Sequence, residues 1–250
     1  MDREKACKVF EEYTKRYDSS DIKIRLKIDH TYRVADISAR IAKSINADED
    51  FAYFLGLLHD IGRFEQLTRY GTFKDADSVD HAELGADILF GEEALIDSFP
   101  CDIEITGMPD RKAMAEAAVR CHNKLTVPEE IDEQTLMYCN ILRDADKIDI
   151  FRVMTEPPYD ERNELIKTMT TPAGEEVMRC VREHRCVPRY VIKNRFEAML
   201  SQCCMALELV YPESMIIVKE QGYLPSLVNM DIKDRQLKNQ LEVLRRELKL

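Results

Sequence analysis

The residues of this chain with the clearest chemical potential are four histidines and two aspartates. They are His30, His59, Asp60, His81, His122 and Asp146. The sequence holds only five histidines, so four of them belong to this set. Because a buried polar group costs several kcal/mol unless it is satisfied, the decisive question is whether the fold buries these six groups together.

The segment FLGLLHDIGRFEQ, residues 54–66, contains the densest part of the set. It is apolar up to Leu58 and then continues with His59 and Asp60. His59 follows Leu55 by four residues, so both side chains lie on the same face of the predicted helix. The pair is therefore expected to point inward, held either by a structural hydrogen bond or by a metal ion.

Helical periodicity surrounds the other four groups as well. The predicted elements are helices over residues 29–45, 110–123 and 136–153, and a helix that Asp80 opens as its N-cap. Each group lies three or four residues from an apolar position of its own helix, and so shares the inward face. The stretch RFEQLTRYGTFKDADSVD, residues 63–80, has no clear apolar repeat and is predicted to be a loop.

Taken singly, each of the six groups has a plain explanation as a hydrogen-bonded core histidine or as a helix cap. Taken together, four buried imidazoles and two buried carboxylates are hard to stabilise without a cation. Mixed histidine and carboxylate ligands suit a divalent transition ion such as Fe, Mn, Zn, Co or Ni. One structural ion needs about four ligands, so six groups predict two ions with open positions for water and substrate.

The order and wording of these motifs resemble the HD-domain superfamily of metal-dependent phosphohydrolases, and HDIG is the form found in one subgroup. The matching segments are the series His30, His59-Asp60 and Asp146, HDIG at 59–62, DHAELGADIL at 80–89, RCHNK at 120–124 and DADKID at 144–149. The resemblance covers residues 25–155. It implies an all-α fold, an HD-domain helical bundle.

The resemblance also implies how the six groups divide between two ions. The ligands implied for the first ion are His30, His59, Asp60 and Asp146. Asp60 would bridge to a second ion, whose other ligands would be His81 and His122. Asp144 and Asp149 flank the last ligand, and we expect them to orient it or to cap the helix.

The sequence departs from the motifs of two HD-domain enzyme classes, which argues against the activities of both. His122 is followed by NKLTVP, with no G-Y-P signature of cyclic-dinucleotide phosphodiesterases. His59-Asp60 is followed by Ile-Gly, where alarmone hydrolases have an acidic pair. The resemblance therefore implies hydrolysis of a small phosphoester by metal-activated water, with nucleotides among the candidate substrates. A di-iron oxygenase with the same ligand set and a non-catalytic nucleotide sensor remain the alternatives.

Basic residues near the predicted ligands are candidates for binding the phosphate. Arg63 follows the HDIG motif, and its forked guanidinium can bond phosphate oxygens at two points. Gly62 is expected to let the chain turn sharply before it. Lys124, two residues after His122, is the next candidate, so the predicted catalytic set is Asp60, Arg63 and Lys124. Weaker candidates are Arg69 and Lys147.

Composition limits the partners and the location. The net charge of −11 argues against binding a nucleic-acid polymer, which favours a basic face. No apolar run approaches the roughly 20 residues that span a bilayer, which argues against a membrane protein. The N-terminus MDREKACKVFEEY lacks the apolar region of a secretory signal, so we expect a cytoplasmic protein.

The organisation predicted for the chain is one composite domain over residues 1–250. Its HD core spans 25–155, and a helical extension over 156–250 is expected to pack on that core. Leucines in a 4-3-4 pattern mark the last helix, at Leu237, Leu241, Leu244 and Leu248. They predict either a homodimer through a short coiled coil or packing within the chain.

Overall fold

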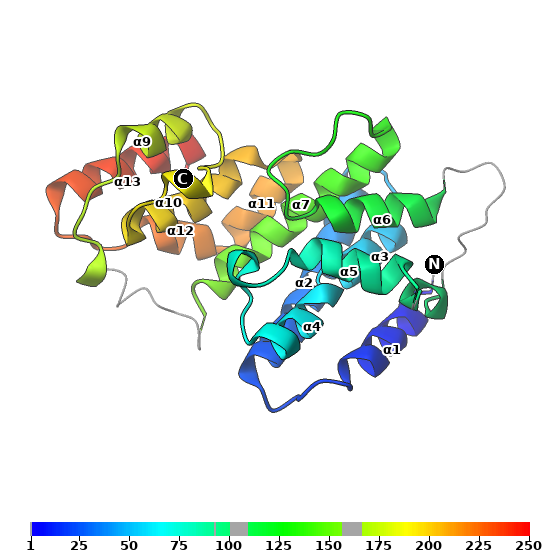
Figure 1. The fold of residues 1–250 in the computed structure, drawn as a ribbon. Helices are drawn as coiled ribbons and strands as arrows, with labels where there is room; N and C mark the ends of the chain where they lie inside the picture. The colour runs from blue at the N-terminus through cyan, green and yellow to red at the C-terminus, as the bar shows by residue number, and fades with distance from the viewer. Residues whose placement is uncertain (1, 93, 101–109, 157–166) are drawn as a thin grey trace. The chain divides into compact units, whose positions relative to one another are not determined.

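The computed structural model of the protein describes residues 2–92, 94–100, 110–156 and 167–250 (Figure 1). These residues form α-helices joined by turns and short 3₁₀ helices, and no strand occurs among them. The all-α prediction is therefore confirmed. The chain divides into two compact units, Met1–Asp146 and Lys147–Leu250, and the division falls inside one long helix.

The first unit contains the six predicted ligands. Its helices are α1 (Arg3–Thr14), α2 (Ile22–Ser44), α3 (Glu49–Leu58), α4 (Ile61–Tyr70), α5 (His81–Phe90), α6 (Arg111–Cys121) and the first part of α7 (Glu133–Val153). Six of these helices follow an aspartate whose carboxylate accepts one or more backbone N–H groups of the first turn. These aspartates are Asp2, Asp21, Asp48, Asp80, Asp110 and Asp132. The predicted cap at Asp80 is confirmed.

Helices α2 and α3 pack against each other along an unusually close contact. A Cβ atom at Gly56 would lie 2.5 Å from the Cα atom of Ala35, so only glycine fits at this position. The side chains of both helices that face this contact are buried, among them Val34, Ile41 and Leu55. The close packing brings His30 on α2 near His59 at the end of α3.

A second close contact joins α4 and α5. A Cβ atom at Gly62 would lie 2.3 Å from the carbonyl oxygen of His81 and 2.6 Å from the backbone nitrogen of Gly85. Gly62 itself lies within a helix, and among the described glycines those with a positive φ are Gly71 and Gly222. The prediction that Gly62 serves a sharp turn is therefore wrong, because the residue is needed for helix packing.

The predicted loop over residues 63–80 is also partly wrong. Its first half belongs to α4, which ends at Gly71 in the left-handed conformation. Ile61, Phe64 and Leu67 are buried on one face of this helix, at a spacing of three residues. The second half contains a short 3₁₀ helix, η1 (Asp75–Asp77). The apolar repeat is not evident within residues 63–80, because its first member, Ile61, lies before that stretch.

The described part of the second unit consists of helices joined by turns and loops. It contains the end of α7, α9 (Glu175–Arg182), α10 (Arg195–Cys204), α11 (Pro212–Gln221), α12 (Tyr223–Val228) and α13 (Arg235–Leu248). The four leucines of the 4-3-4 pattern are buried on α13, which contacts α9 and α12 of the same unit. Packing within the chain therefore accounts for the pattern. The dimer and the packing of this unit on the first one stay predictions.

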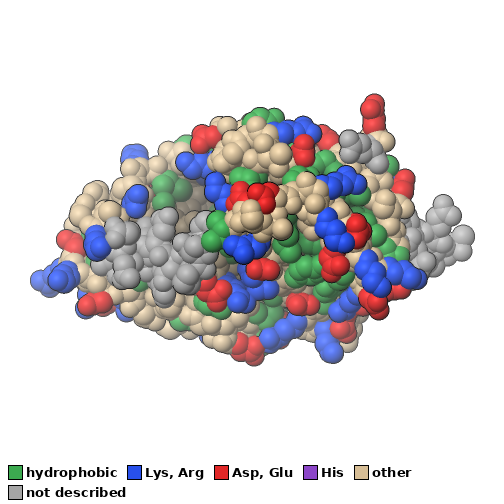
Figure 2. Space-filling view, turned by 90° about the horizontal axis from the view of Figure 1, so that it is seen from below, with side chains coloured by type: hydrophobic (Ala, Val, Ile, Leu, Met, Phe, Trp, Pro, Cys, Tyr) green, Lys and Arg blue, Asp and Glu red, His purple; other side chains and the backbone are tan. Residues whose placement is uncertain are grey.

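Charged side chains of both signs are interspersed on the face of the molecule drawn in Figure 2. Among the described residues, no helix combines the length and the apolar character that crossing a membrane would require.

Candidate metal centre

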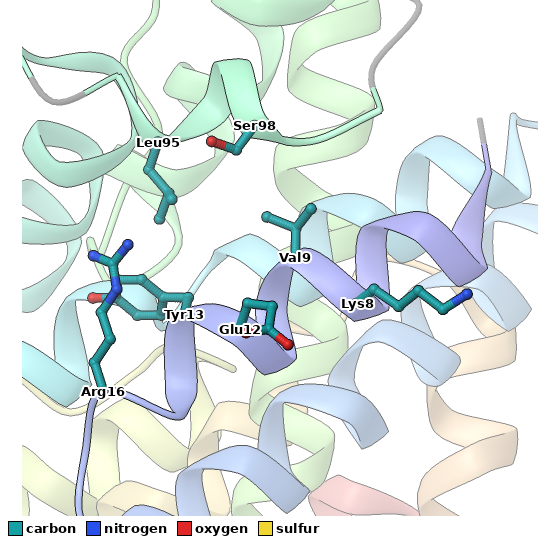
Figure 3. Close-up of a pocket in the computed structure, with 7 residues that line it drawn as sticks. All are labelled: Lys8, Val9, Glu12, Tyr13, Arg16, Leu95 and Ser98. Atoms are coloured by element: carbon teal, nitrogen blue, oxygen red, sulfur yellow. The ribbon is translucent and has the colours of Figure 1, made fainter.

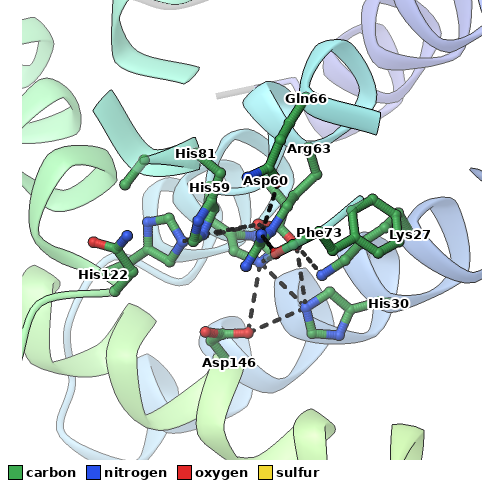
Figure 4. Close-up of polar contacts among 12 residues, drawn as sticks. Lys27, His30, His59, Asp60, Arg63, Gln66, Phe73, His81, His122 and Asp146 are labelled. Carbon is green, nitrogen blue, oxygen red and sulfur yellow. Dashed lines mark hydrogen bonds and ion pairs between the residues drawn. The ribbon is translucent and has the colours of Figure 1, made fainter. Parts of the chain in front are cut away.

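The six predicted ligands come together in the first unit (Figure 4). His30 lies on α2, His81 is the first residue of α5, and Asp146 lies on α7. His59 and His122 directly follow α3 and α6, and Asp60 stands between α3 and α4. The four histidines and Asp60 are buried, whereas 18% of the Asp146 side chain is exposed. The fold thus gathers groups that are up to 116 residues apart in the sequence, from His30 to Asp146.

Asp60 stands at the middle of the cluster. Its Oδ2 lies 3.5 Å from Nε2 of His30 and 3.5 Å from Nε2 of His59. Its Oδ1 lies 3.6 Å from Nε2 of His81 and 3.8 Å from Nε2 of His122. Each carboxylate oxygen therefore faces a different pair of imidazoles, which is the arrangement expected of a residue that bridges two cations.

Asp146 completes the first of these groups. Its Oδ1 lies 3.1 Å from Nε2 of His30 and 3.7 Å from Nε2 of His59. The ligand atoms of His30, His59 and Asp60 lie within 4.8 Å of one another, as do those of Asp60, His81 and His122. We call these two groups, which share Asp60, the first and the second half-site, and Asp146 belongs to the first.

Hydrogen bonds at Nδ1 fix the orientation of His59 and His122. Nδ1 of His59 donates to the carbonyl oxygen of Gly56, and Nδ1 of His122 donates to that of Val119, each at 2.7 Å. Both carbonyls belong to the last turn of a helix, where backbone acceptors have no partner within the helix. Each of these hydrogen bonds gives a partner to a carbonyl of the last helical turn. It also orients the ring so that the Nε2 lone pair points into the centre.

The imidazole nitrogens of the second half-site are arranged to bind a cation. Nδ1 of His81 contacts the carboxylate of Asp75 at 2.8 Å, so it too carries its proton away from the centre. Nε2 of His81 and Nε2 of His122 are then both lone-pair acceptors, yet they lie 3.0 Å apart. Two such atoms repel each other unless a cation lies between or beside them. The donor set of imidazole nitrogens and carboxylate oxygens suits a divalent transition ion.

Basic side chains keep the carboxylates of the centre ionised. Burial alone would raise the pKa of Asp60, but Lys27, His59 and Arg63 together hold that pKa well below its ordinary value. Nζ of Lys27 lies 2.6 Å from Oδ2 of Asp60. The pKa of Asp146 is lowered as well, because contacts with His30 and His59 outweigh its burial. Both carboxylates are therefore available as anionic ligands.

The acid stability of the metal-free protein should reveal the buried imidazoles. Burial, and then the neighbouring His81 and His59, lower the pKa of His122 to about 3. In the unfolded chain this histidine takes up a proton below pH 6.5, its ordinary value, whereas the folded protein resists doing so. The folded state is thus destabilised as the pH falls below 6.5, by about 1.4 kcal/mol per pH unit for one such group.

We expect His122→Asn to reduce this pH dependence. Urea unfolding of chelator-treated protein between pH 7 and pH 5 measures it, in a range above the titration of the carboxylates. His184→Asn is the control, because His184 is exposed in the second unit. Equal slopes for the parent protein and His122→Asn would contradict the expectation.

The predicted phosphate-binding residues already have partners. Nη1 of Arg63 donates to Gln66, to the Phe73 carbonyl and to Asp75, at 2.8, 2.5 and 3.0 Å. Lys124 pairs with Asp80 and with Glu83, the latter at 3.2 Å. The weaker candidates pair with glutamates, Arg69 with Glu65 and Lys147 with Glu208. A role of Arg63 or Lys124 in binding phosphate stays a prediction.

Sequence reasoning missed three residues that contribute to the centre. Lys27 precedes His30 by three residues on α2, a spacing that could have revealed it. Asp75 lies in the stretch predicted to be a loop. Arg143 on α7 donates to the Cys121 carbonyl at 2.8 Å and also to the Lys124 carbonyl, which fixes the backbone on both sides of His122.

A separate pocket of about 270 Å³ lies between α1 and the 3₁₀ helix η2 (Leu95–Ser98) (Figure 3). Tyr13, Arg16 and Leu95 contribute to its lining. None of the residues that line it is a predicted ligand, so the pocket is distinct from the candidate centre.

The comparison with protein families yields one finding. Residues 28–150 match the family model of the HD domain. This range contains all six predicted ligands and lies within residues 25–155, the part of the chain that carries the resemblance. No curated protein and no solved structure matches the chain.

Proposed function

We propose that the protein is a metal-dependent hydrolase of a phosphoester bond in a small molecule, because residues 28–150 match the family model of the HD domain. HD-domain proteins are generally metal-dependent phosphohydrolases. Nucleotides are among the candidate substrates. The HDIG subgroup, the cytoplasmic location and the absence of nucleic-acid and membrane partners are part of this proposal.

The observation that carries the proposal is the position of Asp60 between two pairs of imidazoles. Its Oδ2 faces His30 and His59, and its Oδ1 faces the other pair. Held by these residues, two divalent ions would lower the pKa of a coordinated water towards neutrality and offset the negative charge of a phosphoryl group. The first half-site offers four protein ligands and the second three, so the second leaves more room for water and substrate.

The charges of the centre favour an anionic substrate. Asp60, Asp75 and Asp146 are carboxylates, and Lys27 and Arg63 are the basic side chains closest to them. Two divalent ions would turn this slight excess of negative charge into a clear excess of positive charge. A phosphoester dianion compensates such an excess, whereas a neutral substrate does not.

Lys27 is the basic residue best placed to touch the substrate. Its Nζ contacts Oδ2 of Asp60, and an ammonium group has three N–H donors. One donor can therefore stay on Asp60 while another reaches a phosphoryl oxygen. Arg63 lies near the other carboxylate oxygen of Asp60, with its Nε 3.6 Å from Oδ1.

The proposal predicts more than one transition ion per chain and phosphate release that depends on it. Protein prepared without chelator is analysed for its metals and then assayed for phosphate release from a panel of nucleotides and other small phosphoesters. We expect chelation to abolish the activity and added Mn²⁺, Fe²⁺ or Co²⁺ to restore it.

Three outcomes would contradict the proposal in different ways. One ion per chain would mean that His81 and His122 are ordinary core residues. Two ions without phosphate release from any compound, but with oxygen uptake by the iron-loaded protein, would favour a di-iron oxygenase. Nucleotide binding without turnover in the metal-loaded protein would favour a sensor.

A further inference from the structure

Asp75 differs from the acceptors that orient His59 and His122. His59 and His122 use a carbonyl oxygen three residues earlier, in the helix that each of them follows. His81 is the first residue of α5, so no helical turn precedes it. Its Nδ1 instead contacts both carboxylate oxygens of Asp75, at 2.9 and 2.8 Å.

Asp75 is itself held firmly in this position. Its Oδ1 accepts hydrogen bonds from Nη1 of Arg63 at 3.0 Å and from Nε2 of Gln66 at 2.9 Å. Both donors lie on α4, which begins directly after Asp60. Asp75 thus connects the start of α4 to the imidazole of His81.

We propose that Asp75 is a positioning residue that controls the affinity of the second half-site for its ion. A carboxylate hydrogen-bonded to Nδ1 fixes the ring orientation and makes Nε2 a stronger donor to a metal. The stronger donor is in the second half-site, which has only three protein ligands, so each ligand there contributes a larger share of the affinity for the ion. This inference rests on the proposed two-ion function and adds to it an order of loading, first half-site before second.

The test compares variants in a titration of the chelator-treated full-length protein with Co²⁺. We expect two binding steps in the parent protein. Asp75→Ala should weaken the second step about ten- to a hundredfold and leave the first step unchanged. Asp75→Asn keeps an acceptor oxygen without the charge, so its second step should lie between those of the parent and the alanine variant.

Asp77→Asn is the matched control, because Asp77 lies in the same 3₁₀ helix with 60% of its side chain exposed. The visible spectrum of Co²⁺ reports the ligand geometry of each step, and thermal unfolding of the metal-free variants reports stability. A merely structural role would lower the unfolding temperature but leave the second step and its spectrum as in the parent.

The outcomes separate this inference from the proposed function. Two ions with parental affinities in both Asp75 variants would overturn the role of Asp75 alone. A parent protein that binds one ion or none would overturn the two-ion function and this inference with it. Selective weakening of the second step supports both, and the asparagine variant gives the answer if the alanine variant does not fold.

Discussion

Asp60→Asn is expected to remove both metal ions and to reduce phosphoester hydrolysis at least about a thousandfold. The two oxygens of Asp60 face different half-sites, so a single substitution withdraws an anionic ligand from both. The side chain is 3% exposed, and no other carboxylate lies between the two imidazole pairs in the described centre. Elemental analysis beside a phosphate-release assay measures the effect.

Two further variants test whether the loss of both ions is specific to Asp60. Asp146→Asn should remove one ion, because Asp146 contacts His30 and His59 of the first half-site. Asp149→Asn makes the same chemical change three residues later on the same helix and should leave the ion count at two. If the Asp60→Asn protein kept its full metal content and turnover, Asp60 would not be a bridging ligand.

Lys27→Met is expected to lower kcat/KM for a phosphoester about ten- to a hundredfold, with the metal content unchanged. The loss of one charge-assisted hydrogen bond is worth about 1.5–3 kcal/mol, which gives that range. Methionine keeps much of the length and packing of the lysine side chain while it removes the ammonium group. Steady-state kinetics and metal analysis on the same preparation measure both quantities.

Lys23→Met is a suitable control for this variant, because Lys23 lies one turn earlier on α2 and its Nζ only reaches the Gly71 carbonyl at 3.5 Å. Kinetics within twofold of the parent would mean that Lys27 does not touch the substrate. A loss of metal together with activity would mean that Lys27 acts by holding Asp60 in place.

The ligand positions could be predicted from the sequence because five of the six lie on a helix with apolar residues or directly after its last turn, and Asp60 follows His59 directly. His30 lies in the middle of the long helix α2, where an apolar repeat over several turns defines the buried side. Asp146 follows the buried Leu142 by four residues on α7. His59 and His122 follow the last turn of such helices, so the same repeat still indicates their direction. Periodicity thus indicates the inward direction of these side chains, and Asp146 keeps 18% of its side chain exposed.

The periodicity of apolar residues does not identify the residues that hold the ligand side chains in position. Asp75 contacts His81 from a 3₁₀ helix without an apolar repeat, and this contact depends on where the chain returns after α4. Arg63 donates to acceptors that lie 3 to 12 residues further along the chain. Such contacts arise from the path of the backbone, which spacing along the sequence does not specify.

The contact of Gly62 with α5 has a consequence for any attempt to redesign this centre. Asp60 lies two residues before Gly62, and the backbone of His81 touches Gly62 directly, so main-chain packing sets the separation of the two imidazole pairs. Ligand side chains can be exchanged to favour a softer or a harder metal while that separation is retained. The ligand residues can therefore be substituted in a redesign, but Gly62 cannot. Even the methyl group of an alanine there would push α4 and α5 apart.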